Sequence, residues 1–179
     1  SLGGVVNWRV IPIAGDELNK NIIQYARDVF NLLLGERTAE DVKMKLGSAV
    51  ELSEPLEGAM RGRDLMTGLP KEVTVTDNQI RDAISRSVRQ IVENVKATLE
   101  TTPPELVADI YERGIVMTGG GALLKGLDRL LSSAVEIPVR VTDDPLTCVV
   151  RGIGILIEDE ELLDEVSLRS TALTSAVRA

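Results

Sequence analysis

Three consecutive glycines, Gly119, Gly120 and Gly121, stand between a short apolar run and a segment with helical periodicity. Glycine permits positive φ angles and lets a ligand approach the backbone where a Cβ would collide with it. The first N–H groups of a following helix would favour a phosphate group. The spacing matches neither the Walker phosphate loop nor the dinucleotide fingerprint. The turn is therefore compatible with nucleotide contact and, equally, with a tight strand-to-helix turn required by packing.

A second candidate pair, Glu40 and Lys43, lies on a predicted helix. Residues three apart on a helix point the same way, so the two side chains could hydrogen-bond a ribose hydroxyl and an adenine edge. The alternative is an exposed ion pair, which contributes roughly a few tenths of a kcal/mol. Both interpretations stay open on the sequence alone.

Composition excludes several classes of site. The chain has no histidine and a single cysteine, Cys148, which rules out a Cys–His nucleophile and a Cys/His zinc centre. Cys148 lies in an apolar run and is expected to be a small buried core residue. A net charge of −8 and an aromatic content of 2% argue against nucleic acid as a partner. No apolar run reaches the roughly 20 residues of a membrane-spanning helix.

The first half of the chain predicts a strand, two helices and a small antiparallel sheet. Residues 5–13 are rich in β-branched side chains and are expected to form a strand. An apolar stripe from Leu18 to Leu33 predicts a helix with Asp16 as its N-cap and Gly35 as its stop. A Thr38-x-x-Asp41 capping box predicts the next helix, ending at Gly47, and residues 49–76 read as the sheet.

The second half predicts alternating helices and strands. The stripe Ile80, Ile84, Val88, Ile91, Val95 and Leu99 indicates one long helix from about Asp77. A cap at residues 102–105 starts a short helix that runs to about Arg113. Strands are expected at 115–118 and 139–142, with helices at 122–131 and from Asp143 or Asp144 to Ile157. The fold class is therefore α/β with an inserted lobe.

Five segments together carry a resemblance to a known family. They are residues 35–40 (GERTAE), 61–65 with 68–70 (RGRDL and GLP), 102–106 (TPPEL), 113–124 (RGIVMTGGGALL) and 144–147 (DPLT). In order and spacing they resemble the MreB family of bacterial actin-like filament proteins, over residues 1 to about 160. The glycine turn alone is also similar to FtsA and to heat-shock chaperones of the same superfamily, but the sequences around Arg37 and Arg63 favour MreB.

The resemblance implies an actin-like, ribonuclease H-like fold in which two domains hold ATP and magnesium between them. This chain would be the second, C-terminal domain: residues 1–14 and 76–160 its core lobe, residues 15–75 an inserted small α+β lobe, and residues 161–179 a flexible tail. The N-terminal strands of its sheet would be absent. Both phosphate loops, the magnesium-ligating acid and the water-positioning acid would also lie upstream of Ser1.

By the same similarity, nine residues would contact adenosine from two sides. They are Gly119, Gly120, Gly121, Ala122 and Leu123 on the turn, and Glu40, Asp41, Val42 and Lys43 on the helix. No catalytic residue and no metal ligand is expected in this chain. The family has ATPase activity, but a chain without the phosphate and metal residues is not expected to be catalytic.

The function implied is that of a cytoskeletal protein that determines rod cell shape by organising cell-wall synthesis. Its partners would be further copies of itself in filaments, and RodZ-like and cell-wall elongation proteins at the inner membrane. It would be cytoplasmic, and membrane-associated in the full-length parent. The alternatives are half of a related sugar kinase or phosphatase, or an interaction module that binds no nucleotide. If the chain is complete, the sheet edge beside residues 5–13 is expected to cause oligomerisation or a swapped dimer.

Overall fold

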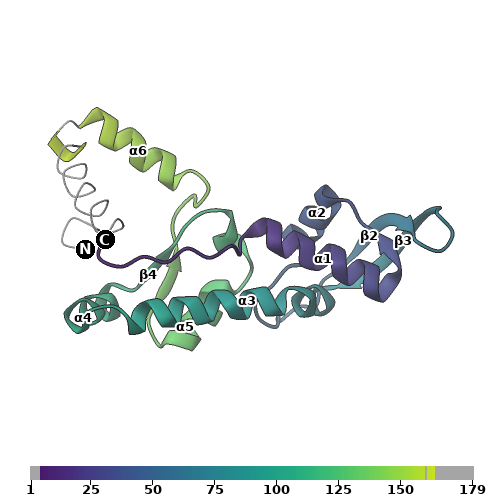
Figure 1. Ribbon diagram of the computed structural model, residues 1–179, viewed down its shortest axis with the longest axis horizontal. Coiled ribbons are helices and arrows are strands. Elements are labelled where there is room, and N and C mark those ends of the chain that lie inside the picture. Colours follow the sequence, from purple (N-terminus) through teal and green to yellow (C-terminus); the bar gives the residue numbers. More distant parts are fainter. Residues whose placement is uncertain (1–4, 160, 164–179) are drawn as a thin grey trace, which may run out of the picture.

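The computed structural model describes residues 5–159 and 161–163. The helices are α1 (Gly15–Phe30), α2 (Glu36–Leu46), α3 (Asp77–Glu100), α4 (Pro104–Arg113), α5 (Leu127–Val135), α6 (Cys148–Glu158) and the short 3₁₀ helix η1 (Gly120–Leu123). The strands are β1 (Leu32–Leu33), β2 (Glu57–Asp64), β3 (Pro70–Thr76), β4 (Ile115–Met117) and β5 (Val139–Val141). Figure 1 shows an elongated molecule with the β2–β3 hairpin at one end and α4 at the other.

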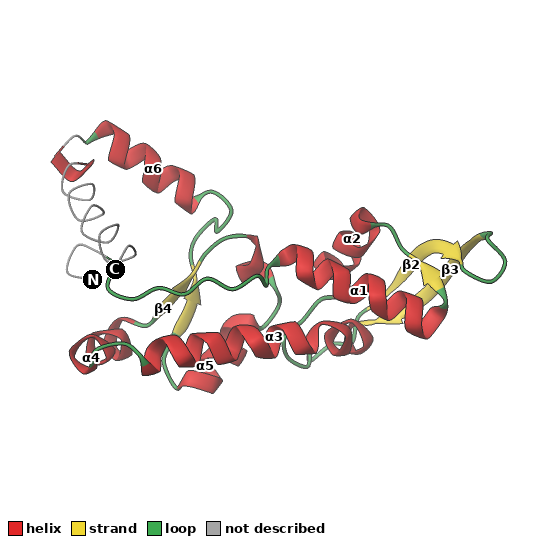
Figure 2. Ribbon diagram, viewed as in Figure 1, coloured by secondary structure: helices red, strands yellow, loops and turns green. Residues whose placement is uncertain are grey.

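The long helix α3 joins the two ends of the molecule (Figure 2). It begins with a complete capping box, in which the Thr76 hydroxyl accepts from the Gln79 N–H at 3.3 Å and the Gln79 side chain accepts from the Thr76 N–H at 2.9 Å. Ile80 and Ile84 are fully buried. The predicted long helix is confirmed. The capping box explains why it begins where it does, because two otherwise free N–H groups are satisfied there.

One hydrophobic core runs through both predicted lobes. It includes Ile22 of α1, Val42 of α2, Met60 of β2, Ile84 of α3 and Leu131 of α5. The core is aliphatic, as an aromatic content of 2% requires. The division into a core lobe and an inserted lobe stays a prediction. The predicted tail lies outside the described residues except for 161–163.

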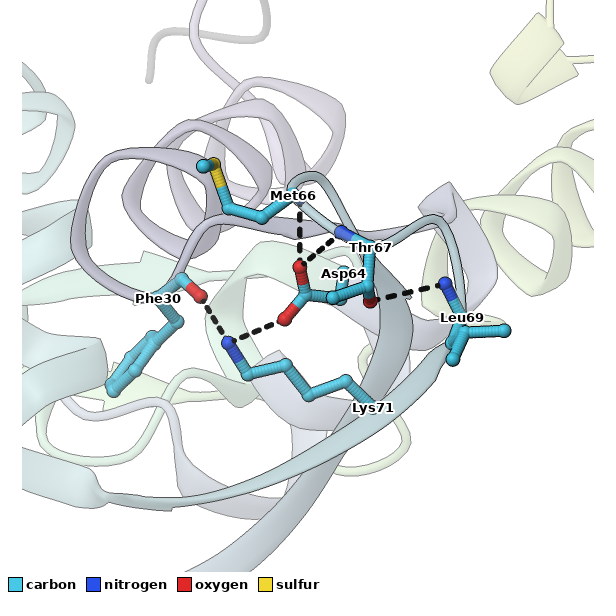
Figure 3. Close-up of polar contacts among 6 residues, drawn as sticks. All are labelled: Phe30, Asp64, Met66, Thr67, Leu69 and Lys71. Carbon is cyan, nitrogen blue, oxygen red and sulfur yellow. Dashed lines mark hydrogen bonds and ion pairs between the residues drawn. The ribbon is translucent and has the colours of Figure 1, made fainter.

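The predicted antiparallel sheet over residues 49–76 is confirmed in the hairpin formed by β2 and β3. Strand order is β1-β2-β3, and the hairpin closes at the pair Arg63 and Pro70. Figure 3 shows that the Asp64 carboxylate holds the turn: it accepts from the Met66 N–H at 2.7 Å and the Thr67 N–H at 3.0 Å. Lys71 donates both to this carboxylate and to the Phe30 carbonyl oxygen. The turn is therefore a fixed structure and is tied to the end of α1.

The second sheet contains two parallel strands, β4 and β5, which pair Ile115 with Val139 and Met117 with Val141. Both strands were predicted. β4 leads directly into the glycine turn, so this small sheet fixes the position at which the turn begins.

The strand predicted at residues 5–13 is wrong. The segment has no ladder hydrogen bonds, because no strand of the described chain lies beside it. Its side chains attach it to α3 instead. Asn7 donates to the Thr98 carbonyl oxygen at 3.1 Å and the Thr101 hydroxyl at 2.9 Å. A β-branched run favours a strand but cannot supply the neighbouring strand with which it must pair.

The predicted boundaries of the first two helices are also wrong. α1 ends at Phe30, because Asn31 takes the left-handed conformation (φ 51°) and its N–H bonds back into the last turn. Leu33, predicted to be helical, lies in β1. The N-caps are Ala14 and Gly35, so Asp16 lies in the first turn of α1 and Thr38 lies inside α2. The predicted end of α2 at Gly47 is confirmed, since Gly47 is the C-cap of that helix.

Three predictions in the second half need similar correction. Gly126 (φ 73°) splits the helix expected at 122–131 into η1 and α5. Asp144 (φ 48°) makes a turn, so α6 starts at Cys148, which is half-buried rather than part of the core. α4 begins and ends as expected, but Thr102 is not its cap. The Thr102 hydroxyl donates instead to the Thr98 carbonyl oxygen at 2.7 Å.

Candidate functional site

The glycine turn leaves β4 through Gly119, whose φ of 80° is one that side chains with a Cβ rarely adopt. The Gly119 N–H donates to the Pro145 carbonyl oxygen at 2.8 Å, and its own carbonyl oxygen accepts from the Ala122 N–H at 3.1 Å. These bonds fix the direction in which the chain enters η1. Gly119 is therefore required by backbone conformation.

Gly120 and Gly121 have a different environment. Both are exposed, and a Cβ added to Gly121 would meet nothing within 4 Å. At Gly120 the nearest atom would be Leu146 Cδ2 at 3.5 Å, an ordinary contact. Their N–H groups have no protein acceptor in the described part of the chain. Packing within the described residues therefore gives no reason for these two glycines.

The other two residues predicted on the turn differ from each other. Ala122 is buried, with 6% of its surface exposed, so its methyl group belongs to the protein interior. Leu123 is exposed and lies beside the open glycines. A ligand over this turn could contact the Leu123 side chain and backbone N–H groups, but not the Ala122 side chain.

The α2 residues are divided by the helix face on which they lie. Glu40 and Asp41 are exposed and Val42 is buried in the core. Lys43 is half-buried, and its ammonium donates to the Gly15 carbonyl oxygen at 3.1 Å. The Glu40–Lys43 ion pair that the sequence allowed does not form in the structure, since Lys43 is directed at the start of α1. Among the described residues no hydrogen bond or ion pair engages the Glu40 carboxylate, which is exposed and could bind a ligand.

Residues missed by sequence reasoning connect α2 to the glycine turn. The Ala49 N–H donates to the Lys125 carbonyl oxygen at 2.8 Å, and the Lys125 ammonium donates to the Lys45 carbonyl oxygen. Gly126 follows in the left-handed conformation, and a Cβ there would overlap Val50 Cγ2. The only sequence signal was the glycine itself, since its contact with Val50 joins residues far apart in the chain. The two halves of the predicted site are thus held in one unit.

The exposed groups of the glycine turn and of α2 are hydrogen-bond donors and a carboxylate acceptor. Exposed N–H groups and a carboxylate can bind a base and a ribose. Among residues 5–159 and 161–163, no group of three acidic, histidine or cysteine side chains is placed to hold a metal ion.

Comparison with known proteins decides the family. The sequence profile described as MreB/Mbl protein matches residues 1–165. The chain belongs to the MreB/Mbl family. It is 42% identical over 168 residues to the cell shape-determining protein Mbl of Bacillus subtilis strain 168, covering 94% of this chain and 50% of Mbl. To the cell shape-determining protein MreB of Escherichia coli K12 it is 48% identical over 158 residues, covering 88% of this chain and 46% of MreB.

Solved structures agree with this assignment. MreB5 of Spiroplasma citri bound to ADP matches with a TM-score of 0.82 and 36% identity, over 84% of this chain and 46% of MreB5. The same protein bound to AMPPNP gives a TM-score of 0.84, 36% identity and coverage of 87% and 47%. The predicted α/β class is confirmed as a mixed α/β fold matching these crystal structures over about half their length. A MamK double helical filament matches with a TM-score of 0.66 at 21% identity, which shows a shared fold only.

The chain spans about half the length of its MreB and Mbl relatives. The activity and partners of a whole MreB protein therefore remain proposals for this chain. Within the described ranges, no helix is both long enough and apolar enough to cross a membrane.

Proposed function

We propose that this chain is the C-terminal, second-domain half of an actin-like, ATP-binding and filament-forming protein that determines cell shape. In this proposal the glycine turn and the exposed face of α2 contact adenosine from two sides. The contacts would come from the N–H groups of Gly120 and Gly121, from Leu123 and from Glu40. Family membership supports the proposal, as do the related MreB5 structures with bound ADP and AMPPNP.

The observation that carries this proposal is the open space over Gly121. A glycine that is required by packing has a neighbour where its Cβ would lie, as Gly126 does with Val50. Gly121 has none within 4 Å, and its N–H is free in the described chain. A backbone without a Cβ and with unused donors leaves room for a ligand that lies directly on it.

Adenosine contact alone does not hydrolyse ATP. A transferred phosphoryl group needs in-line positioning and a metal ion to stabilise the developing charge. When bound, ATP with magnesium would supply the phosphate chemistry, and we assign that chemistry to the other half of the parent protein. The residues of this chain would bind and orient the base and ribose.

The rest of the parent would also complete the sheet that contains β4. A groove of about 360 Å³ separates residues 9–11 from β4 and is floored by Ile91, Val95 and Leu99 of α3. β4 pairs only with β5 in the described chain. We place the further N-terminal strands of the family's sheet in this groove, where apolar side chains would cover the half-buried part of α3.

The test is a titration of a fluorescent ATP analogue, followed by anisotropy. Gly121→Val places a branched side chain in the open space, and we expect it to weaken binding at least tenfold without loss of structure. Gly152→Val is the matched control, because a Cβ at Gly152 of α6 also meets nothing within 4 Å. Circular dichroism checks that both variants fold.

Equal binding by the wild-type chain and Gly121→Val would refute the contact at the glycine turn. No measurable binding by either would favour the interaction module that binds no nucleotide. Family membership gives no support to the sugar-kinase alternative. Filament formation by self-association, RodZ-like adaptors and cell-wall elongation proteins at the inner membrane complete the proposal for the full-length parent.

A further inference from the structure

Strand β2 has a free edge over most of its length. β1 pairs with β2 only in the last two residues of β2, so no strand of the described chain lies beside residues 57–61 on that side. Two hydrogen bonds at the hairpin show which way successive N–H groups are directed. The Asp64 N–H donates to the Leu69 carbonyl oxygen, just before β3, at 2.8 Å. The Leu65 N–H donates to the Asn31 carbonyl oxygen, just before β1, at 2.8 Å.

These two bonds fix the alternation along β2. In an antiparallel ladder, successive residues direct their N–H and C=O groups to opposite sides. The even-numbered residues of β2 therefore bond to β3, and the odd-numbered residues Glu57, Ala59 and Arg61 direct their backbone groups to the free edge. No other segment of the described chain bonds to the N–H groups of Ala59 and Arg61. The edge thus presents the hydrogen-bonding pattern that an additional strand would need.

A groove runs along this edge, because α2 lies beside β2 and forms its second wall (Figure 1). Its volume is about 420 Å³, and ligand pockets have roughly 300–1,000 Å³. The buried side chains of Val42 and Leu46 supply apolar contact, and the exposed Asp41 and Lys45 line the same wall. The groove therefore combines free backbone groups, apolar surface and two charges.

The charges on the α2 wall have the spacing of an extended peptide. Asp41 and Lys45 are four residues apart, about 6 Å along the helix axis. Neither forms an ion pair among the described residues. Alternate side chains of a strand lie on one face, about 6.5–7 Å apart. The Leu46 side chain lies against Gly58, so the Lys45 end of α2 is beside the start of β2.

We propose that this groove binds an extended peptide segment of another protein, which adds to the edge of β2 as an antiparallel strand. The peptide backbone pairs with Ala59 and Arg61. A basic side chain of the peptide meets Asp41, and an acidic side chain two positions later meets Lys45. Backbone pairing supplies affinity, and the side-chain contacts supply specificity and register. This site needs no nucleotide, and it is separate from the groove at residues 9–11.

The outer edge of β3 offers a comparison within the same sheet. Thr74 lies opposite Ala59, so its N–H is directed away from β2 in the same way that the Ala59 N–H is directed away from β3. The residues that line the groove come from α2 and β2 and include none from β3. We therefore expect the peptide at the β2 edge and not at the β3 edge.

The probe is a fluorescein-labelled peptide with the core TKVET, titrated into the chain and followed by anisotropy and by amide NMR. We expect the N–H signals of Ala59 and Arg61 to shift on binding and that of Thr74 to stay in place. Ala59→Pro removes the central N–H of the edge and should weaken binding by about tenfold or more. Thr74→Pro is the matched control on the other edge and should bind as the wild-type chain does.

The two charges are tested by exchange. The peptide with the core TEVKT should bind about tenfold more weakly than TKVET, because both ion pairs become repulsive. The double variant Asp41→Lys, Lys45→Glu should prefer TEVKT instead. This reversal cannot arise from a general loss of structure, and circular dichroism checks that each variant folds.

Four results would overturn the proposal. TKVET might show no saturable binding, or both proline variants might bind it equally. The wild-type chain and the charge-exchanged variant might have the same preference between the two peptides. A dimer in sedimentation velocity that Ala59→Pro dissociates would show that a second copy pairs with β2 in place of the peptide.

Discussion

Replacement of Gly126 by alanine tests how the glycine turn is joined to α2. Two costs apply at this position. The φ of 73° is unfavourable for any residue with a Cβ, by roughly 1–2 kcal/mol. The new methyl group would also overlap Val50 Cγ2, and overpacking of this kind costs about 1–3 kcal/mol. Loss of freedom in the unfolded chain offsets about 0.4–1 kcal/mol of the total. We expect Gly126→Ala to lower the free energy of unfolding by about 2–4 kcal/mol.

Gly68 provides the matched control. Its φ is 74°, nearly the same, but a Cβ there would meet nothing within 4 Å. Gly68→Ala should therefore show the conformational cost alone, about 0.5–1.5 kcal/mol. Urea unfolding followed by circular dichroism measures both variants. In a double-mutant cycle, Val50→Ala should recover the steric part of the Gly126→Ala loss. Equal losses at Gly68 and Gly126, or no coupling with Val50, would refute the close contact.

Two further predictions concern the turn of the hairpin and the start of α3. The Lys71 ammonium, with the N–H groups of Thr67 and Met66, lowers the pKa of Asp64 from 3.8 to about 2. The ionised Asp64 carboxylate therefore stabilises the folded state above about pH 4, and this stabilisation is lost as pH falls toward 2. Lys71→Gln should raise the pKa of Asp64 in an NMR titration. Thr76→Ala should cost about 0.5–2 kcal/mol in urea unfolding, whereas Thr38→Ala, inside α2, should cost less. An unchanged pKa, or equal costs at the two threonines, would contradict these assignments.

The confirmed sequence predictions rested on regular apolar spacing and on glycine and proline residues at the ends of elements. The stripe from Ile80 to Val88 marks one face of α3 over several turns, and such a signal survives a change in any single residue. The hairpin and the strands β4 and β5 are bounded by glycine and proline, which restrict the backbone locally. The family followed from whole segments in a fixed order, which agrees with the profile match over residues 1–165.

The incorrect strand prediction and the contact made by Lys43 both depended on residues that are distant in the sequence. Residues 5–13 have the composition of a strand, but a ladder needs a partner that composition does not show. Lys43 lies on the expected face of α2, yet its ammonium bonds to the carbonyl oxygen of Gly15, which is 28 residues away. The left-handed Asn31 ended a helix whose apolar stripe continued past it. The first two outcomes are set by tertiary structure, whereas the left-handed Asn31 is a local helix cap that the apolar stripe does not reveal.

The continuous packing along α3 has a thermodynamic consequence. A helix of 24 residues spans about 36 Å, and here its first half packs with α1 and β3 while its later turns adjoin residues 7–11. Both ends of the molecule contribute residues to one hydrophobic cluster. We therefore expect the two predicted lobes to unfold as one cooperative unit, so that a destabilising change in the hairpin also lowers the stability of the glycine turn.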